Sequence, residues 1–102
     1  MSKYKSIRTE VDGVWFDSKR EAARYSELKM LMRSGIITAL ELQPEFPIVI
    51  NGYKICIYRA DFKYKAREGW TVIEDSKGMQ TPVYKLKKKL VEAVHGVRIV
   101  EV

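Results

Sequence analysis

Few side chains in this sequence can bind soft metals or form cross-links. Its 102 residues include a single cysteine, Cys56, and a single histidine, His95. One cysteine cannot close an internal disulfide, and a structural zinc site takes four cysteine or histidine ligands. The sequence therefore excludes a disulfide-linked scaffold and a structural zinc centre.

Long hydrophobic runs are also missing. The stretch from Phe46 to Ile50 is among the longest, and it is far shorter than the roughly 20 apolar residues that a membrane-spanning helix needs. The N-terminal residues MSKYKSIRTE lack the apolar segment of a secretory signal. We therefore expect a cytoplasmic protein that has no membrane partner.

Acidic residues are outnumbered by basic ones, 13 to 19, which gives a net charge of +6. Otherwise the composition is ordinary, because 46% hydrophobic and 31% charged residues are typical of one globular domain. The positive charge favours a polyanionic partner such as nucleic acid, although excess lysine can also serve solubility.

The first helix is signalled at both ends. Ser18-Lys-Arg-Glu21 fits a capping box, in which Ser18 is the N-cap and Glu21 the third helical residue. Apolar residues then recur at helical spacing until Gly35, a natural stop. These signals predict a helix over roughly 18–34.

Two residue pairs ending in glycine predict tight turns. Asp12-Gly13 predicts a small hairpin or extended arm at the N-terminus, and Asn51-Gly52 predicts a hairpin joining the β-rich runs 37–50 and 53–64. Residues 70–77 then form a third predicted strand. Its first four residues do not alternate between apolar and polar, which predicts a central strand covered on both faces.

A second helix and a last strand complete the predicted order. Thr81-Pro82 is typical of an N-cap followed by proline at the first helical position, and a strand is expected over 97–102. We therefore expect a single α/β domain, with an arm over 1–17 and an αβββαβ core whose mixed sheet is flanked by two helices. The expected apolar stripe of the second helix is Val83, Leu86, Leu90, Ala93 and Val94.

The third strand runs into a cluster of charge, VIEDSKG at 72–78. Asp75 and Lys77 are two residues apart, so on a strand their side chains leave the same face. The neighbouring predicted strand carries Asp61, and two carboxylates that approach closely can share a divalent cation, for which oxygen ligands favour Mg²⁺ or Mn²⁺. Lys77 would then neutralise charge in phosphoryl transfer. The alternative is a salt bridge at the strand end, since the acid-x-Lys pattern occurs 4 times in the sequence.

The order of these elements and acids resembles the core of the PD-(D/E)XK nuclease superfamily, over about residues 18–101. Within it, the whole chain is similar to a family of small phage-encoded proteins. The resemblance implies a restriction-endonuclease-like fold and a Mg²⁺-dependent DNA nuclease. The matching phrases are FDSKREAARYSELK, LQPEFPI, ADF, EDSKG and TPVYKLKKKLVEA.

Site residues follow from this resemblance. It implies that Asp61 and Asp75 bind the metal, that Lys77 is the catalytic lysine, and that Glu21 takes the place of the helix acid of Holliday junction resolvase-like members. The alternative for Glu21 is a structural role alone, as part of the capping box. Glu74 could replace Asp75 if a bulge reorients the strand.

Other positions depart from the family pattern or have two readings. The proline usual before the first aspartate is Ala60 here. Gln43 either lines the site or is a polar group at a strand end. Lys85, Lys88 and Lys89 form either one basic side for DNA phosphates or a solvated helix face.

The expected function is hydrolysis of DNA by a Mg²⁺-dependent endonuclease, with Mn²⁺ as a substitute metal. By analogy with resolvase-like relatives, the substrate is branched or junction DNA in phage DNA metabolism, and cutting two strands would take a homodimer. The alternative is a non-catalytic DNA-binding module of a phage replication or recombination complex.

Overall fold

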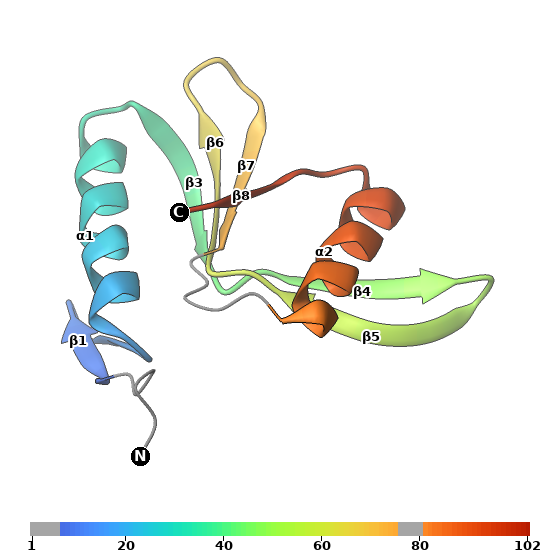
Figure 1. Cartoon of the computed structure of the whole chain (residues 1–102). Coiled ribbons are helices and arrows are strands. Elements are labelled where there is room, and N and C mark those ends of the chain that lie inside the picture. The colour runs from blue at the N-terminus through green and yellow to red at the C-terminus, as the bar shows by residue number, and fades with distance from the viewer. Residues whose placement is uncertain (1–6, 76–80) are drawn as a thin grey trace.

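A computed structural model describes residues 7–75 and 81–102 of the chain. These residues form two helices and eight strands, which Figure 1 shows from the N-terminal hairpin to the short last strand. In chain order they are β1 (Thr9–Val11), β2 (Val14–Phe16), α1 (Lys19–Arg33), β3 (Ile37–Leu42), β4 (Glu45–Ile50), β5 (Tyr53–Arg59), β6 (Phe62–Ala66), β7 (Thr71–Asp75), α2 (Pro82–His95) and β8 (Ile99–Glu101).

A four-stranded mixed sheet forms the centre of the fold, in the order β3-β6-β7-β8. β3, β6 and β7 pair antiparallel, and β8 pairs parallel to β7 after the α2 crossover. This confirms the predicted α/β class and the central position of the third strand. The order α1-β3-β6-β7-α2-β8 is the predicted αβββαβ, and β4 and β5 form a separate two-stranded hairpin inserted after β3.

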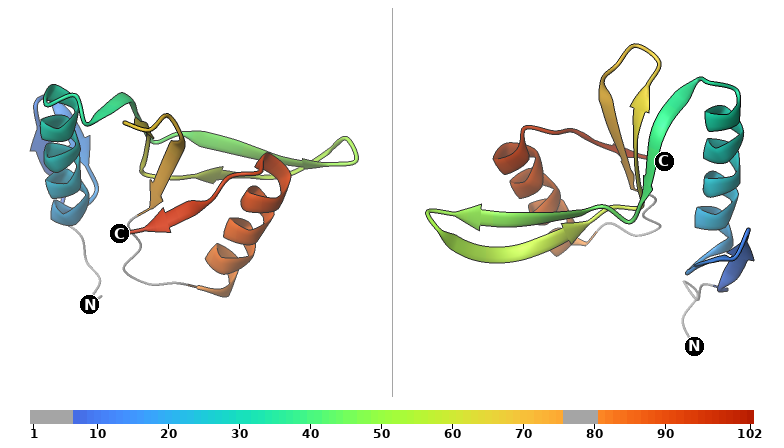
Figure 2. Two further views of the ribbon diagram at one scale, coloured as in Figure 1. Left: turned by 90° about the horizontal axis from the view of Figure 1, so that it is seen from above. Right: turned by 180° about the vertical axis from the view of Figure 1, so that it is seen from behind.

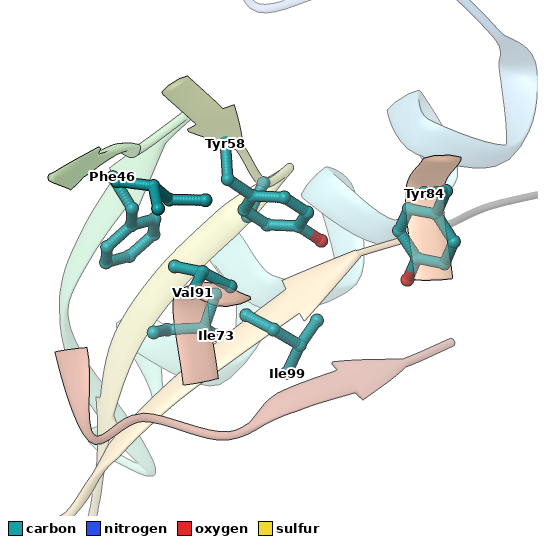
Figure 3. Close-up of a cluster of buried hydrophobic side chains, with 8 residues drawn as sticks. Phe46, Tyr58, Ile73, Tyr84, Val91 and Ile99 are labelled. Carbon is teal, nitrogen blue, oxygen red and sulfur yellow. The ribbon is translucent and has the colours of Figure 1, made fainter. Parts of the chain in front are cut away.

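The two helices lie on opposite sides of this sheet (Figure 2). Successive residues of a strand point to opposite faces, so β7 contributes to both layers. Val72 packs into a cluster with α1, and Ile73 into a second cluster with α2 and the β4–β5 hairpin. Figure 3 shows this second cluster, in which Tyr58 lies between Phe46 and Tyr84.

The predicted helix caps and tight turns are confirmed. The Ser18 hydroxyl oxygen accepts a hydrogen bond from the Glu21 N–H at 3.1 Å, and the Thr81 hydroxyl oxygen accepts one from the Tyr84 N–H at 3.1 Å. Positive φ angles at both turn residues of Asp12-Gly13 and of Asn51-Gly52 fit the tight two-residue hairpin turn that such pairs favour.

The prediction of one continuous strand over 53–64 is wrong. The chain bends at Ala60 and Asp61, where it leaves the hairpin and enters the sheet. The segment paired with it, between β3 and β4, bends at the same place. There Gln43 adopts a positive φ of 49°, and Pro44 has no N–H to donate to a ladder. We call residues 43–44 and 60–61 the corner.

The predicted face of α2 is also wrong in part. Four of the five predicted residues, Val83, Leu86, Ala93 and Val94, are exposed, and only Leu90 is partly buried. The buried residues of the helix are Tyr84 and Val91. Tyr84 faces the sheet, where its ring packs in the second cluster and its hydroxyl donates a hydrogen bond of 2.8 Å to Glu101 on β8. Trp70, expected in the third strand, precedes β7 and is 62% exposed.

Leu28 provides a test of the α1 layer. Its side chain is fully buried against the sheet, so Leu28→Ala should lower the free energy of unfolding by about 2–5 kcal/mol. The matched control is Met30→Ala on the solvent side of the same helix, which should change it by less than about 0.5 kcal/mol. Urea denaturation of both variants measures the difference. Equal effects would show that α1 does not pack as described.

Candidate nuclease site

Asp61 and Asp75 lie at the same end of the central sheet. β6 begins directly after Asp61, and its antiparallel partner β7 ends at Asp75. The Asp61 N–H donates a hydrogen bond of 3.0 Å to the Glu74 carbonyl, which ties the two segments together. The pairing of strands on which the predicted Asp61–Asp75 site depends is therefore present.

The corner places Gln43 beside Asp61. The Gln43 N–H donates to the Asp61 carbonyl at 2.9 Å, and the Ala60 N–H donates to the Pro44 carbonyl at 3.1 Å. These bonds carry the backbone pairing across the bend between the sheet and the hairpin. The result is that Asp61 lies where the chain changes direction, and the exposed residue Gln43 is bonded to it through the backbone.

Asp75 is fully buried at the end of β7. The Tyr58 hydroxyl, from β5, donates a hydrogen bond to its Oδ2. Burial, followed by this contact with Asp75, raises the pKa of Tyr58 well above its ordinary value. The Tyr58 hydroxyl therefore keeps its proton at neutral pH and holds the carboxylate in one orientation.

Glu74 is equally buried and faces the opposite side, toward α1. Arg24 of α1 binds it with two hydrogen bonds, Nε to Oε1 at 2.8 Å and Nη2 to Oε2 at 2.6 Å. The Tyr64 hydroxyl donates to Oε2 as well, and burial together with Glu74 raises the pKa of Tyr64 to about 12. The two-pronged geometry is the strong form of an arginine–carboxylate pair.

This pairing bears on the choice between the two acids. The charge of Glu74 is already balanced by Arg24, so the fold accounts for Glu74 without a metal. Asp75, on the other face, shares its end of the sheet with Asp61. Arg24 was missed in the sequence because its partner depends on which face of β7 each acid occupies.

Glu21 lies in the turn of α1 that approaches this end of the sheet. Its neighbour Arg20 donates to the Val102 carbonyl at 2.7 Å, and Val102 in turn donates its N–H to the Asp75 carbonyl at 3.2 Å. One turn further along, the ring of Tyr25 stacks at 6.4 Å from that of Phe62, which follows Asp61. The first turns of α1 thus lie near the end of the β6–β7 pair that carries Asp61 and Asp75.

The three lysines predicted to bind DNA gather on one side of α2. Lys85, Lys88 and Lys89 surround a hollow of about 270 Å³ together with Glu92 and Glu101. Lys88 Nζ lies 3.4 Å from Glu101 Oε2, so part of this positive charge is balanced within the protein. Their common placement agrees with one basic side, and DNA binding there stays a prediction.

The predicted site includes one residue beyond the described ranges and two carboxylates within them. Lys77 lies outside the described residues, so its place beside Asp75 stays a prediction. Within residues 7–75 and 81–102, no group of three or more histidine, cysteine, aspartate or glutamate side chains is arranged to hold a metal ion. A site built on Asp61 and Asp75 therefore rests on two carboxylates in the described structure.

The chain belongs to the family described as "Protein of unknown function (DUF1064)", which matches residues 1–99. No curated protein and no solved structure matches it. In the described part of the chain, neither helix is long and apolar enough to span a membrane.

The Arg24–Glu74 pair can be tested by a double-mutant cycle. Arg24→Met leaves a buried carboxylate without its cation, which should lower the free energy of unfolding by roughly 3 kcal/mol. Adding Glu74→Gln removes that charge and should restore part of the loss. Arg33→Met, an exposed arginine on the same helix, is the control and should change stability by less than about 0.5 kcal/mol. If Arg24→Met and Arg33→Met unfold alike in urea, the pair contributes nothing.

Proposed function

We propose that the protein is a Mg²⁺-dependent DNA endonuclease, with Mn²⁺ as a substitute metal, that hydrolyses phosphodiester bonds in branched or junction DNA in the host cytoplasm. The observation that carries this proposal is the pairing of β6 with β7, which brings Asp61 and Asp75 to one end of the sheet. The family match covers residues 1–99, so it supports assigning one function to almost the whole chain.

Asp61 and Asp75 suit a hard divalent cation. Mg²⁺ takes oxygen ligands and is usually bound by one or two carboxylates, with water and substrate phosphates completing its shell. Asp61 and Asp75 would supply two such oxygen ligands from neighbouring strands at one end of the sheet. When bound, the metal supplies Lewis-acid stabilisation of negative charge on the phosphate.

The protein's own groups then have distinct tasks. Tyr58 orients Asp75 through its hydroxyl, and Glu74 stays paired with Arg24 on the other face. Lys77 orients the attacking water and neutralises charge in the transition state. Glu21, in the first turn of α1, completes the acidic site.

DNA is bound through its backbone in this proposal. Lys85, Lys88 and Lys89 contact phosphates, and Gln43, exposed beside Asp61, contacts the strand near the cut. A domain of this size has little room for reading sequence, so recognition by shape is favoured. Cutting both strands of a junction takes two active sites, which a symmetric homodimer would supply.

The second candidate function is a non-catalytic DNA-binding module of a phage replication or recombination complex. It is supported by the common placement of Lys85, Lys88 and Lys89 around one hollow, since binding of DNA phosphates there needs no metal. Nicking of supercoiled plasmid separates the two, because only the endonuclease converts it to relaxed circles in Mg²⁺ and stops when the metal is chelated.

Asp75→Asn tests the metal ligand directly. The change keeps the size of the side chain and an oxygen to accept from Tyr58, but it removes the charge. Cleavage of a four-way junction in Mg²⁺ should fall at least about a hundredfold, since even groups behind the ligands of a metal typically contribute 10- to 100-fold. DNA binding in EDTA should be retained.

The control for this change is Glu68→Gln, the same loss of a carboxylate at the exposed turn between β6 and β7, at the other end of the sheet. It should cut like the wild type. Wild-type cleavage by Asp75→Asn would mean that Asp75 is not a ligand.

Glu21→Gln separates the two roles of Glu21. Either side chain satisfies a capping box, so the free energy of unfolding should change by no more than about 1 kcal/mol. Loss of a ligand charge should nevertheless lower cleavage sharply, with partial recovery at higher Mg²⁺ or in Mn²⁺. Glu21→Ala, which removes both roles, should also lower the melting temperature. Full activity of Glu21→Gln would leave Glu21 as a helix cap only.

A further inference from the structure

A second hollow opens on the α2 side of the sheet, between β5 and the first turns of α2. Its volume is about 310 Å³. Besides Thr81, side chains of three kinds meet there: two cations, two tyrosines and two aliphatic groups. They are Arg59, Lys87, Tyr58, Tyr84, Ile57 and Val83.

The cations of this hollow can accept an anion. Arg59 is bonded to Glu45 at 2.7 Å, but both side chains are more than half exposed. Exposed pairs of this kind are weak, so a phosphate can replace Glu45 at little cost. Lys87 makes no ion pair with any residue in the described ranges 7–75 and 81–102. This differs from Lys88 on the same helix, which is held by Glu101.

The apolar walls point to the same ligand. Val83 is largely exposed although it lies in the apolar pattern of α2, and Ile57 is exposed on β5. A ligand that satisfies both the aliphatic walls and the two cations has an apolar part and an anionic part. A nucleotide has this composition, with its base or sugar against the walls and its phosphates against Arg59 and Lys87.

The hollow adjoins the candidate site through one side chain. Tyr58 lines the hollow, and its hydroxyl donates to Asp75. Figure 3 shows Tyr58 next to Tyr84, and their ring centres are 6.4 Å apart. A ligand in the hollow is therefore separated from the proposed metal ligand by a single tyrosine.

We propose that this hollow binds one unpaired nucleotide of the DNA strand. This inference rests on the proposed function and specifies its substrate. At about 310 Å³ the hollow is at the small end of ligand sites, which suits a single nucleotide and not a segment of duplex. A paired base is stacked within the helix and cannot enter, whereas a splayed strand at a branch supplies a free one.

The test compares two lysines of α2. Splayed-arm DNA and plain duplex are titrated in EDTA by fluorescence anisotropy, so that no cleavage occurs. Lys87→Gln should weaken binding of the splayed DNA roughly tenfold and leave the duplex nearly unchanged, because only an unpaired nucleotide reaches Lys87. The matched control is Lys89→Gln, which removes the same charge at the other hollow and should weaken both DNAs by one common factor.

A second variant blocks the wall of the hollow. Val83→Asp places a negative charge there, and an acid in the first turn of a helix is tolerated, so the melting temperature should be retained. Its affinity for splayed DNA should fall to that for duplex. In addition, 2-aminopurine at the unpaired position should change fluorescence on binding the wild type but not Val83→Asp.

Two results would overturn the inference: equal weakening of both DNAs by Lys87→Gln and Lys89→Gln, or wild-type binding of splayed DNA by Val83→Asp. Failure of the proposed function gives a different result. If splayed DNA binds selectively through Lys87 and Val83 but Mg²⁺ never produces a cut, the nucleotide site stands and the endonuclease does not.

Discussion

Burial of two consecutive carboxylates, Glu74 and Asp75, is the constraint around which the fold is arranged. Each buried charge costs several kcal/mol unless it is paired or hydrogen-bonded. Because neighbouring strand residues face opposite ways, one layer must satisfy each acid. Arg24 and Tyr64 satisfy Glu74 on the α1 side, and Tyr58 binds Asp75 on the α2 side. The registers of α1 and β5 against β7 are therefore set by polar contacts as well as by apolar packing.

Local signals in the sequence were sufficient for most of the secondary structure. The caps at Ser18 and Thr81 and the turn at Asn51-Gly52 act through residues a few positions apart, so they can be predicted without knowing the fold. The corner could not be read in this way. Its bend at Ala60 depends on hydrogen bonds to residues 43–44, which are distant in sequence.

The candidate site was also predictable only in part. Asp61 and Asp75 could be placed together because a hairpin-like order implies that their strands pair. The partner of Glu74 could not be predicted, because the sequence does not distinguish Arg24 from the other arginines of the same helix. The face of α2 was missed for a related reason: buried Tyr84 both packs in the second cluster and bonds Glu101, and a pattern of aliphatic residues does not include it.

The place of β7 between the two hydrophobic clusters has a consequence for how the molecule comes apart. Val72 belongs to one cluster and Ile73 to the other, so β7 is covered on both faces and separation of either layer would uncover one of them. β7 is also paired on both edges, with β6 and with β8. Its amide hydrogens should therefore exchange with solvent only when the whole domain opens, while those near the tip of the β4–β5 hairpin exchange through local fraying.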